Sequence, residues 1–171
     1  MKRIAATLGI LVALAFPVAV LADTTGGSDV PPAGSTGGMT IQVRSVQLTT
    51  RAVAQLTVAI SCEPKPASDY PLVTRWEDTF VQVSVRQTNG RTIAFGGGGF
   101  GFDADQVCDG TTHLMAIGVP ADPSSVPFKT GSAAVGASGS ASYSVENWDT
   151  GEFGFHQASA STGWIATRLS K

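Results

Sequence analysis

Alternation of large apolar side chains with small or polar ones, at a period of two, is the feature that most limits how this chain can fold. Residues 56–62 (LTVAISC) and 81–87 (VQVSVRQ) show it most clearly. Because successive side chains of a β-strand point to opposite faces, this pattern predicts strands buried on one face, as in antiparallel sheets. No segment carries the 3.6-residue apolar stripe of an amphipathic helix.

Several other segments repeat the alternation and extend the prediction of strands to the rest of the chain. We expect further strands at residues 41–48, 91–95, 113–119, 132–137, 140–145 and 153–169, the last broken near residues 162–163. Asn89-Gly90, between two of the strands, suits the positive φ angles of a type I′ hairpin turn. The sequence therefore predicts an all-β, two-sheet antiparallel sandwich of about seven to nine strands, in preference to a closed barrel.

The N-terminus has the pattern of an export signal. Lys2 and Arg3 precede an apolar run, and the small residues before Asp23 resemble a cleavage site, so we predict a signal peptide at residues 1–22. An uncleaved membrane anchor is the alternative, although Thr7, Gly9 and Pro17 interrupt the run. Cleavage would leave a secreted, extracellular chain with no membrane segment.

The rest of the chain divides into a short lead and one domain. Residues 23–39 are rich in Gly, Ser, Thr and Pro, which predicts a flexible lead, and residues 40–171 form the predicted sandwich domain. Losing Lys2 and Arg3 takes the formal charge from −2 to −4. A mildly acidic chain without a basic cluster is a poor match for nucleic acid.

Two cysteines, Cys62 and Cys108, are expected to form a disulfide, because exported chains meet oxidising conditions. The chain-entropy relation gives such a bond about 4 kcal/mol as an upper figure. A reactive thiol pair is the alternative, but the chain has no C-x-x-C spacing and no histidine beside either cysteine.

The order Cys62, Trp76, Cys108 resembles the Cys, Trp, Cys order of immunoglobulin-like sandwiches, in which the tryptophan packs on a disulfide between the sheets. Position 106 departs from that pattern, since Gln stands where those domains carry a corner Tyr. The chain also resembles small exported bacterial β-sandwich proteins of unknown function, through Cys108-Asp109-Gly110 and residues 128–131 (FKTG). These resemblances imply a fold and a compartment but no activity.

Catalytic and metal-binding patterns are weak, and we expect no catalytic residues, no cofactor and no metal. The chain lacks Gly-x-Ser-x-Gly and Ser-x-x-Lys, and its two histidines, His113 and His156, lie far apart in sequence. Calcium is the weak exception, because Asp103, Asp105 and Asp109 could supply hard oxygen ligands. A solvated acidic turn is the alternative for these three aspartates.

Glycines and phenylalanines form two further patterns. The run Gly96–Gly99 lacks the ending of a phosphate loop, so we expect a flexible crossing or bulged edge, with a mobile lip as the alternative. Residues 100–102 (FGF) and 153–155 (FGF) each place two rings on one sheet face. These rings either fill the core or form a ligand platform.

Three classes of function stay open. The first is a non-catalytic module that binds a sugar, a small molecule or a protein, with Trp76, Trp148 and Tyr70 as candidate ligand-binding residues because they lie in polar, loop-like segments. The second is a structural envelope or matrix component. The third is a secreted hydrolase whose site is assembled from scattered residues.

Overall fold

A computed structural model describes residues 37–65, 73–147 and 149–171. The chain divides into two compact units, residues 1–30 and 31–171, and every described residue belongs to the second. The predicted signal peptide and nearly all of the predicted lead lie outside the described residues.

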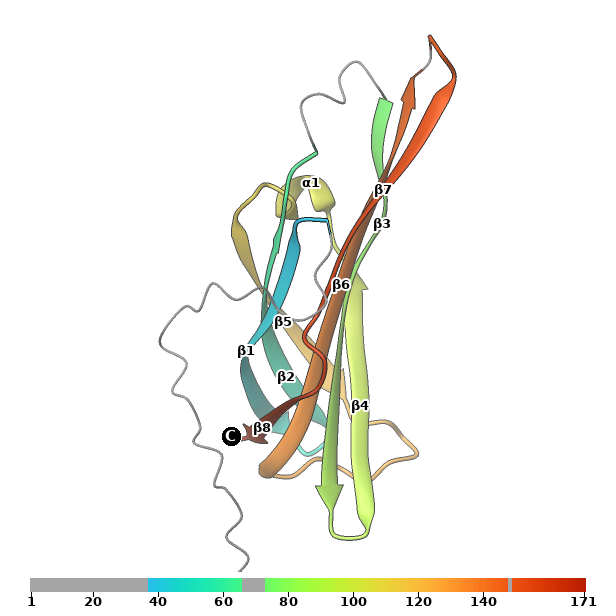
Figure 1. Ribbon diagram of the computed structural model, residues 1–171. Helices are drawn as coiled ribbons and strands as arrows, with labels where there is room; N and C mark the ends of the chain where they lie inside the picture. Colours follow the sequence, from blue (N-terminus) through green and yellow to red (C-terminus); the bar gives the residue numbers. More distant parts are fainter. Residues whose placement is uncertain (1–36, 66–72, 148) are drawn as a thin grey trace, which may run out of the picture. The chain divides into compact units, whose positions relative to one another are not determined.

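The described part contains eight strands and one helical turn (Figure 1). A three-stranded sheet has the order β1-β2-β5, and a five-stranded sheet has the order β4-β3-β6-β7, with β8 also paired to β6. Their bounds are β1 (Met39–Thr50), β2 (Val53–Cys62), β3 (Val73–Asn89), β4 (Thr92–Gly101), α1 (Ala104–Val107), β5 (Thr112–Pro120), β6 (Gly131–Asn147), β7 (Glu152–Ser161) and β8 (Ile165–Leu169).

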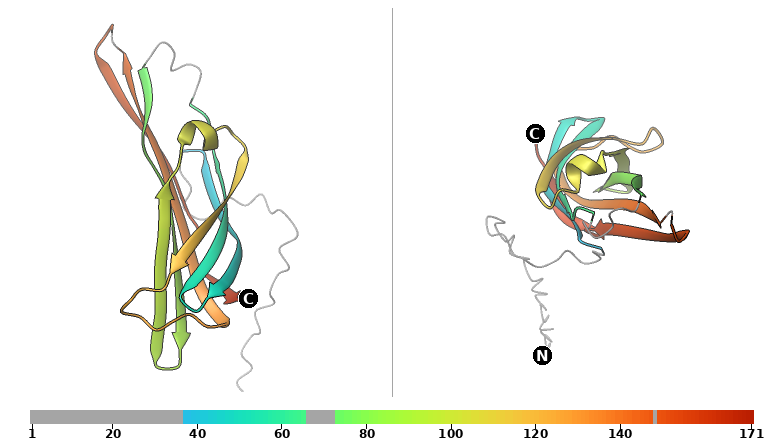
Figure 2. Two further views of the ribbon diagram at one scale, coloured as in Figure 1. Left: turned by 180° about the vertical axis from the view of Figure 1, so that it is seen from behind. Right: turned by 90° about the horizontal axis from the view of Figure 1, so that it is seen from above.

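All pairings within the two sheets are antiparallel, which confirms the predicted two-sheet sandwich. The sheets curve around opposite sides of a shared core (Figure 2). Two isolated bridges join them at their edges, Gly96 with Ala121 and Gln47 with Ser170.

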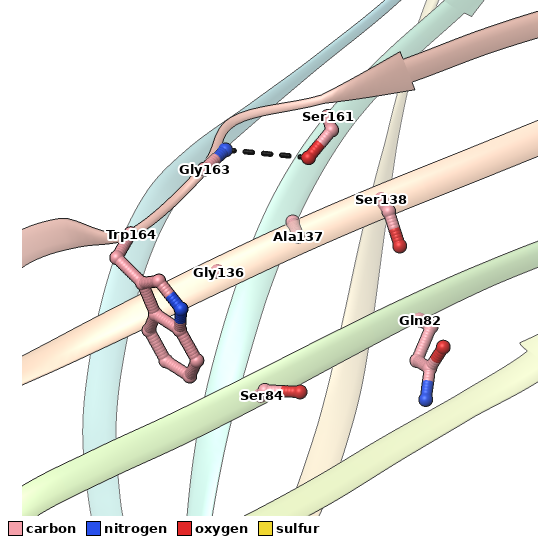
Figure 3. A pocket seen from close by; sticks show the side chains of 8 residues that line it. All are labelled: Gln82, Ser84, Gly136, Ala137, Ser138, Ser161, Gly163 and Trp164. Atoms are coloured by element: carbon pink, nitrogen blue, oxygen red, sulfur yellow. Dashed lines mark hydrogen bonds between the residues drawn. The ribbon is translucent and has the colours of Figure 1, made fainter.

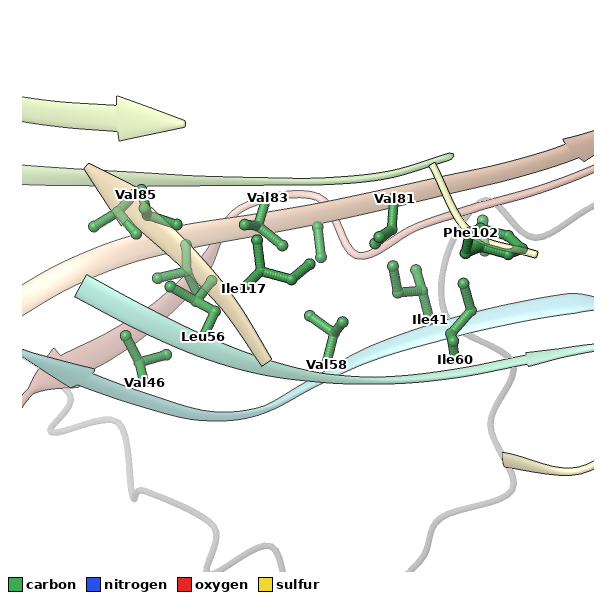
Figure 4. Close-up of a cluster of buried hydrophobic side chains, with 14 of the residues drawn as sticks. Ile41, Val46, Leu56, Val58, Ile60, Val81, Val83, Val85, Phe102 and Ile117 are labelled. Carbon is green, nitrogen blue, oxygen red and sulfur yellow. The ribbon is translucent and has the colours of Figure 1, made fainter. Parts of the chain in front are cut away.

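The core comes from inward-facing side chains of both sheets (Figure 4). Leu56, Val58 and Ile60 of β2 are fully buried, opposite Val81, Val83 and Val85 of β3. Both sets recur at every second residue, as the alternation predicted. Each such side chain contributes about 1.5–3 kcal/mol by leaving water.

One strand replaces two that the sequence predicted. Residues 132–137 and 140–145 belong to a single continuous strand, β6, so a break between them was a wrong prediction. Gly139 lies between the two predicted segments, and a Cβ there would lie 3.2 Å from Met39 Cε and 3.3 Å from Ile60 Cδ1. Gly139 therefore makes room for core side chains of the other sheet rather than forming a turn.

The hairpin between β3 and β4 is confirmed, but its turn is shifted by one residue. Asn89 pairs with Thr92, so Gly90 and Arg91 are the central residues. Gly90 has a φ of 65°, and no described residue other than glycine has a positive φ. Glycine with positive φ at the first central position is the pattern of a type II′ turn rather than the expected I′.

The disulfide is confirmed, and it lies at the crossing between the sheets. Cys62 ends β2, and Cys108 follows α1, which leads from β4 to β5. The Cα atoms of the two cysteines are 4.3 Å apart, and the amide of Gly110 donates to the Cys62 carbonyl. The bond thus fixes the crossing segment to the end of β2, whereas the immunoglobulin-like pattern implies a bridge between strands of opposite sheets.

The glycine run forms part of the regular strand β4, so the expected bulge is absent from it. A Cβ on Gly96 would overlap the carbonyl oxygen of Pro120, and one on Gly98 would overlap that of Gly118. Backbone contact between β4 and β5 therefore requires glycine at these two positions. Gly97 faces the other way, and a Cβ there would lie 3.7 Å from the Val83 oxygen.

Alanine substitutions test this close approach. We expect Gly98→Ala to lower the free energy of unfolding by about 1–3 kcal/mol, the usual cost of overpacking. Gly97→Ala is the matched control and should change stability by less than about 0.5 kcal/mol. Urea unfolding of both variants measures the difference, and equal stability of the two would show that β4 and β5 are not in backbone contact.

Candidate functional site

Trp76, which the sequence analysis named as a candidate ligand-binding residue, is held in a packed cluster. Its indole Nε1 donates to Asp105 Oδ1 at 2.7 Å, and Lys65 Nζ lies 5.3 Å from the ring centre. Tyr143 meets the same ring edge-on at 5.3 Å and stacks on His156 at 5.0 Å. Neighbours thus occupy both the polar edge and the ring of Trp76. The other two candidates, Trp148 and Tyr70, lie outside the described residues.

The three aspartates proposed for calcium point to different partners. Asp103 caps α1 by accepting from the Asp105 amide, and Asp105 pairs with Lys65 at 3.3 Å. Asp109 accepts from His113 instead, at 3.0 Å. In the described part of the chain, no group of three or more His, Cys, Asp or Glu side chains is arranged to hold a metal ion.

Asp109 is the most strongly perturbed of these carboxylates. The side chain of His113 and both the amide and hydroxyl of Thr111 donate to it. These hydrogen bonds, that of His113 first, hold the pKa of Asp109 well below its ordinary value of 3.8. Because Asp109 lies just before β5 and bonds to Thr111 and His113, we assign it a role in ordering the turn after the disulfide.

Acid titration tests this role. A carboxyl whose pKa is lower in the folded chain stabilises the fold above its unfolded pKa and loses that effect below about pH 4. Asp109→Asn should therefore be less stable than the parent at pH 7 and should lose less stability on acidification. Urea midpoints at several pH values measure this, with Asp149→Asn as the control; parallel pH curves for parent and Asp109→Asn would contradict the assignment.

A pocket of about 200 Å³ lies on the outer face of the five-stranded sheet, the face turned away from the core (Figure 3). Trp164, in the link between β7 and β8, forms one wall and is 60% exposed. The floor consists of small and polar residues of β3, β6 and β7, namely Gln82, Ser84, Gly136, Ala137, Ser138 and Ser161.

The break between β7 and β8 places Trp164 over this floor. Gly163 adopts a left-handed φ of 61°, which turns the chain. The Thr162 hydroxyl accepts from the Ala137 amide at 3.0 Å and donates to the Gly163 carbonyl at 2.8 Å, so β6 holds the link. A Cβ on Gly136 would lie 3.2 Å from the Gly163 oxygen, so glycine lets the link lie close to the sheet.

The polar residues of the floor are available to a ligand. Within the described ranges, no hydrogen bond involves the side chains of Gln82, Ser84 or Ser138. A side-chain amide and two hydroxyls offer both donors and acceptors. An exposed indole therefore stands beside three uncommitted polar groups.

A second pocket, of about 470 Å³, adjoins the first. Ser84 and Trp164 line both pockets, and the second adds Arg86, Ile93 and Phe95, together with Ser124 and Ser125 of the loop before β6. Together we call the two pockets the Trp164 groove. Among the described residues, no carboxylate, histidine or cysteine lines it.

The loop wall of the groove is anchored by a buried amide. Gln87, only 2% exposed, donates through Nε2 to the Lys129 carbonyl at 2.7 Å, and its Oε1 accepts from the Lys129 amide at 2.8 Å. Phe128 next to it is fully buried, and its amide donates to the Arg51 carbonyl. These contacts hold the loop in place beside β4.

Sequence reasoning found the break at residues 162–163 but missed the aromatic residue directly after it. Trp164 looked like part of a strand, where a ring is usually buried. The signal that was missed is an aromatic residue directly after a Thr-Gly break. Because the strand is interrupted at the break, this side chain does not have to follow the alternation between the two faces of the sheet.

Comparisons with family models, with curated proteins and with solved structures found no match to this chain. Among the described residues, no helix is long and apolar enough to cross a membrane.

Proposed function

We propose that this chain is an exported, non-catalytic binding module and that the Trp164 groove is its site for a sugar ring. A pyranose has C–H faces that stack on an aromatic ring and hydroxyls at its rim that need hydrogen-bond partners. Tryptophan offers a large amphipathic surface of this kind. The exposed Trp164 ring beside three uncommitted polar side chains is the observation that carries the proposal.

The chemistry of the lining supports binding rather than catalysis. Hydrolysis of a glycoside uses two carboxylates on either side of the bond, and none of the described residues that line the groove is a carboxylate. Arg86 is the one charged residue among the described lining residues, and it can hydrogen-bond hydroxyls or a carboxylate of the ligand. Its presence favours sugars with acidic groups over basic ones.

The disulfide supports the exported compartment in this proposal, since such bonds persist where conditions are oxidising. The signal-like start of the sequence points to the same compartment. A structural role in an envelope or matrix is the second candidate, and the exposed apolar side chains on the outer face favour it.

An immobilised glycan array tests the proposal. We expect the parent chain to bind a subset of the sugars and Trp164→Ala to bind them at least about tenfold more weakly, which corresponds to 1.4 kcal/mol. Leu114→Ala is the matched control, because Leu114 is 68% exposed on the outer face of the three-stranded sheet. It should bind as the parent does.

Two results would refute sugar binding at this groove. The first is that the parent binds none of the arrayed sugars. The second is that Trp164→Ala and Leu114→Ala retain the same affinity as the parent.

A further inference from the structure

The second pocket of the groove lies where a row of small residues meets a row of large ones. On the outer face of the sheet, Ser84 pairs with Gly97 on one side and with Gly136 on the other, so this row carries one small side chain. In the next row towards the turn between β3 and β4, Arg86 pairs with Phe95. The small row leaves a hollow, and Arg86 and Phe95 bound it at one end.

The two pockets differ in the chemistry of their linings. The first is lined by the uncommitted side chains of Gln82 and Ser138. The second is lined by three exposed apolar side chains, those of Trp164, Phe95 and Ile93. Hydroxyls of a ligand would lose hydrogen bonds to water against such a surface, whereas apolar groups gain from contact with it. The second pocket therefore suits a ligand unit that carries an apolar substituent.

Arg86 is the charged side chain of the second pocket, and it is free to bind a ligand. The hydroxyls of Ser124 and Ser125 in the same lining already donate, to the Asp122 carboxylate and the Phe95 carbonyl. Across residues 37–65, 73–147 and 149–171, no ion pair or hydrogen bond involves the Arg86 side chain. A guanidinium presents a planar fork of donors that matches the two oxygens of a carboxylate. The pocket therefore also suits a carboxylate.

The surroundings of Arg86 favour a negative ligand. By register, its described neighbours on the outer face are uncharged, namely Ser84, Thr88, Phe95 and Ala134. Asp122, in the loop wall, lines neither pocket, and its carboxylate accepts from the amide and hydroxyl of Ser124. Its charge is thus held by the loop, and the positive charge of Arg86 stays unpaired.

The groove is longer than one sugar ring. Gln82 lines the first pocket and Arg86 lines the second, and the four-residue step between them along β3 spans about 13 Å. Trp164 and Ser84 line both pockets, and in Figure 3 the Trp164 ring extends across Gly136 towards Ser84. A ligand that fills both pockets therefore has at least two units and passes along a single indole.

We propose that the groove binds an oligosaccharide of at least two units, and that the unit in the second pocket carries a carboxylate and an apolar substituent. Arg86 binds the carboxylate, Phe95 and Ile93 contact the apolar substituent, and a neutral unit lies beside Gln82 in the first pocket. This inference rests on the proposed sugar site and adds the class of its ligand. A lactyl ether, which holds a methyl group and a carboxylate on one carbon, meets both requirements.

Two disaccharides that differ in one substituent test the proposal. N-acetylglucosaminyl-N-acetylmuramic acid carries a lactyl ether at a position where diacetylchitobiose has a hydroxyl. Calorimetric titration of the full chain measures both dissociation constants. We expect the acidic disaccharide to bind at least about tenfold more tightly. Its lactyl amide, which keeps the methyl group and loses the charge, should bind more weakly than the acid.

Two arginine variants locate the recognition. Arg86→Gln should remove the preference, so that the two disaccharides bind within about twofold of each other, and should leave the affinity for diacetylchitobiose unchanged. Arg168→Gln is the matched control, because Arg168 is exposed on the same face and does not line the groove. It removes the same charge and should keep the preference. Circular dichroism of each variant verifies that it is folded.

The apolar contact has a variant of its own. Ile93→Ser should weaken binding of the acidic disaccharide by about threefold or more, because the methyl group then loses its apolar neighbour. Unchanged affinity in this variant would refute the apolar substituent.

The results distinguish this inference from the proposed function. Equal binding of the two disaccharides by the parent, or an equal loss of preference in both arginine variants, would overturn the ligand class and leave sugar binding at the groove in place. Binding of other arrayed sugars but of neither disaccharide would do the same. A parent that binds no sugar at all would overturn both, and binding to phosphatidylglycerol vesicles that Trp164→Ala abolishes would then assign the groove to an anionic membrane surface.

Discussion

The hydrogen bonding of β6 along both of its edges is the interaction on which the rest of this structure depends. This strand, Gly131–Asn147, pairs with β3 on one edge, and on the other edge with β8 over residues 131–135 and with β7 over residues 138–147. Because two strands share one edge, the chain must leave β6 and return to it between them. That short link carries Trp164 and holds it over the outer face, so the candidate site follows from the pairing.

Small side chains allow β6 to hold this central position. Ala137 and Ala141 face the core, and Gly139 between them leaves room for Met39 and Ile60 of the other sheet. On the opposite face, Gly136 lets the link to β8 lie close to the strand. Larger residues at these positions would separate the sheets on one face or lift Trp164 away on the other.

Periodicity alone predicted the fold class, because each strand has one buried face. The hairpin at Gly90, the break before Trp164 and the disulfide also had local signals in the sequence. The continuity of β6 did not, because the effect of Gly139 depends on side chains about 80 and 100 residues away in sequence, and local patterns carry no such information. The glycines of β4 were misread for the same reason, since the backbone of β5 sets their role.

The candidate site was harder to predict than the fold. The sequence directed attention to tryptophans in polar segments, and the polar neighbours of Trp76 are the ones that hold it in place, Asp105 and Lys65. Trp164 is exposed for a topological reason, namely that β7 and β8 share one partner. Only the pairing of the strands shows this.

Amide hydrogen exchange along β6, resolved by NMR, tests the account most directly. A continuous strand with partners on both edges predicts slow exchange of the amides of Ser138, Gly139 and Ser140, comparable to that of Val135 and Ala141. Rapid exchange confined to residues 138–140 would mean that the strand is broken there. It would then be wrong that β7 and β8 pair with the same edge of β6, and the placement of Trp164 that follows from this pairing would be wrong too.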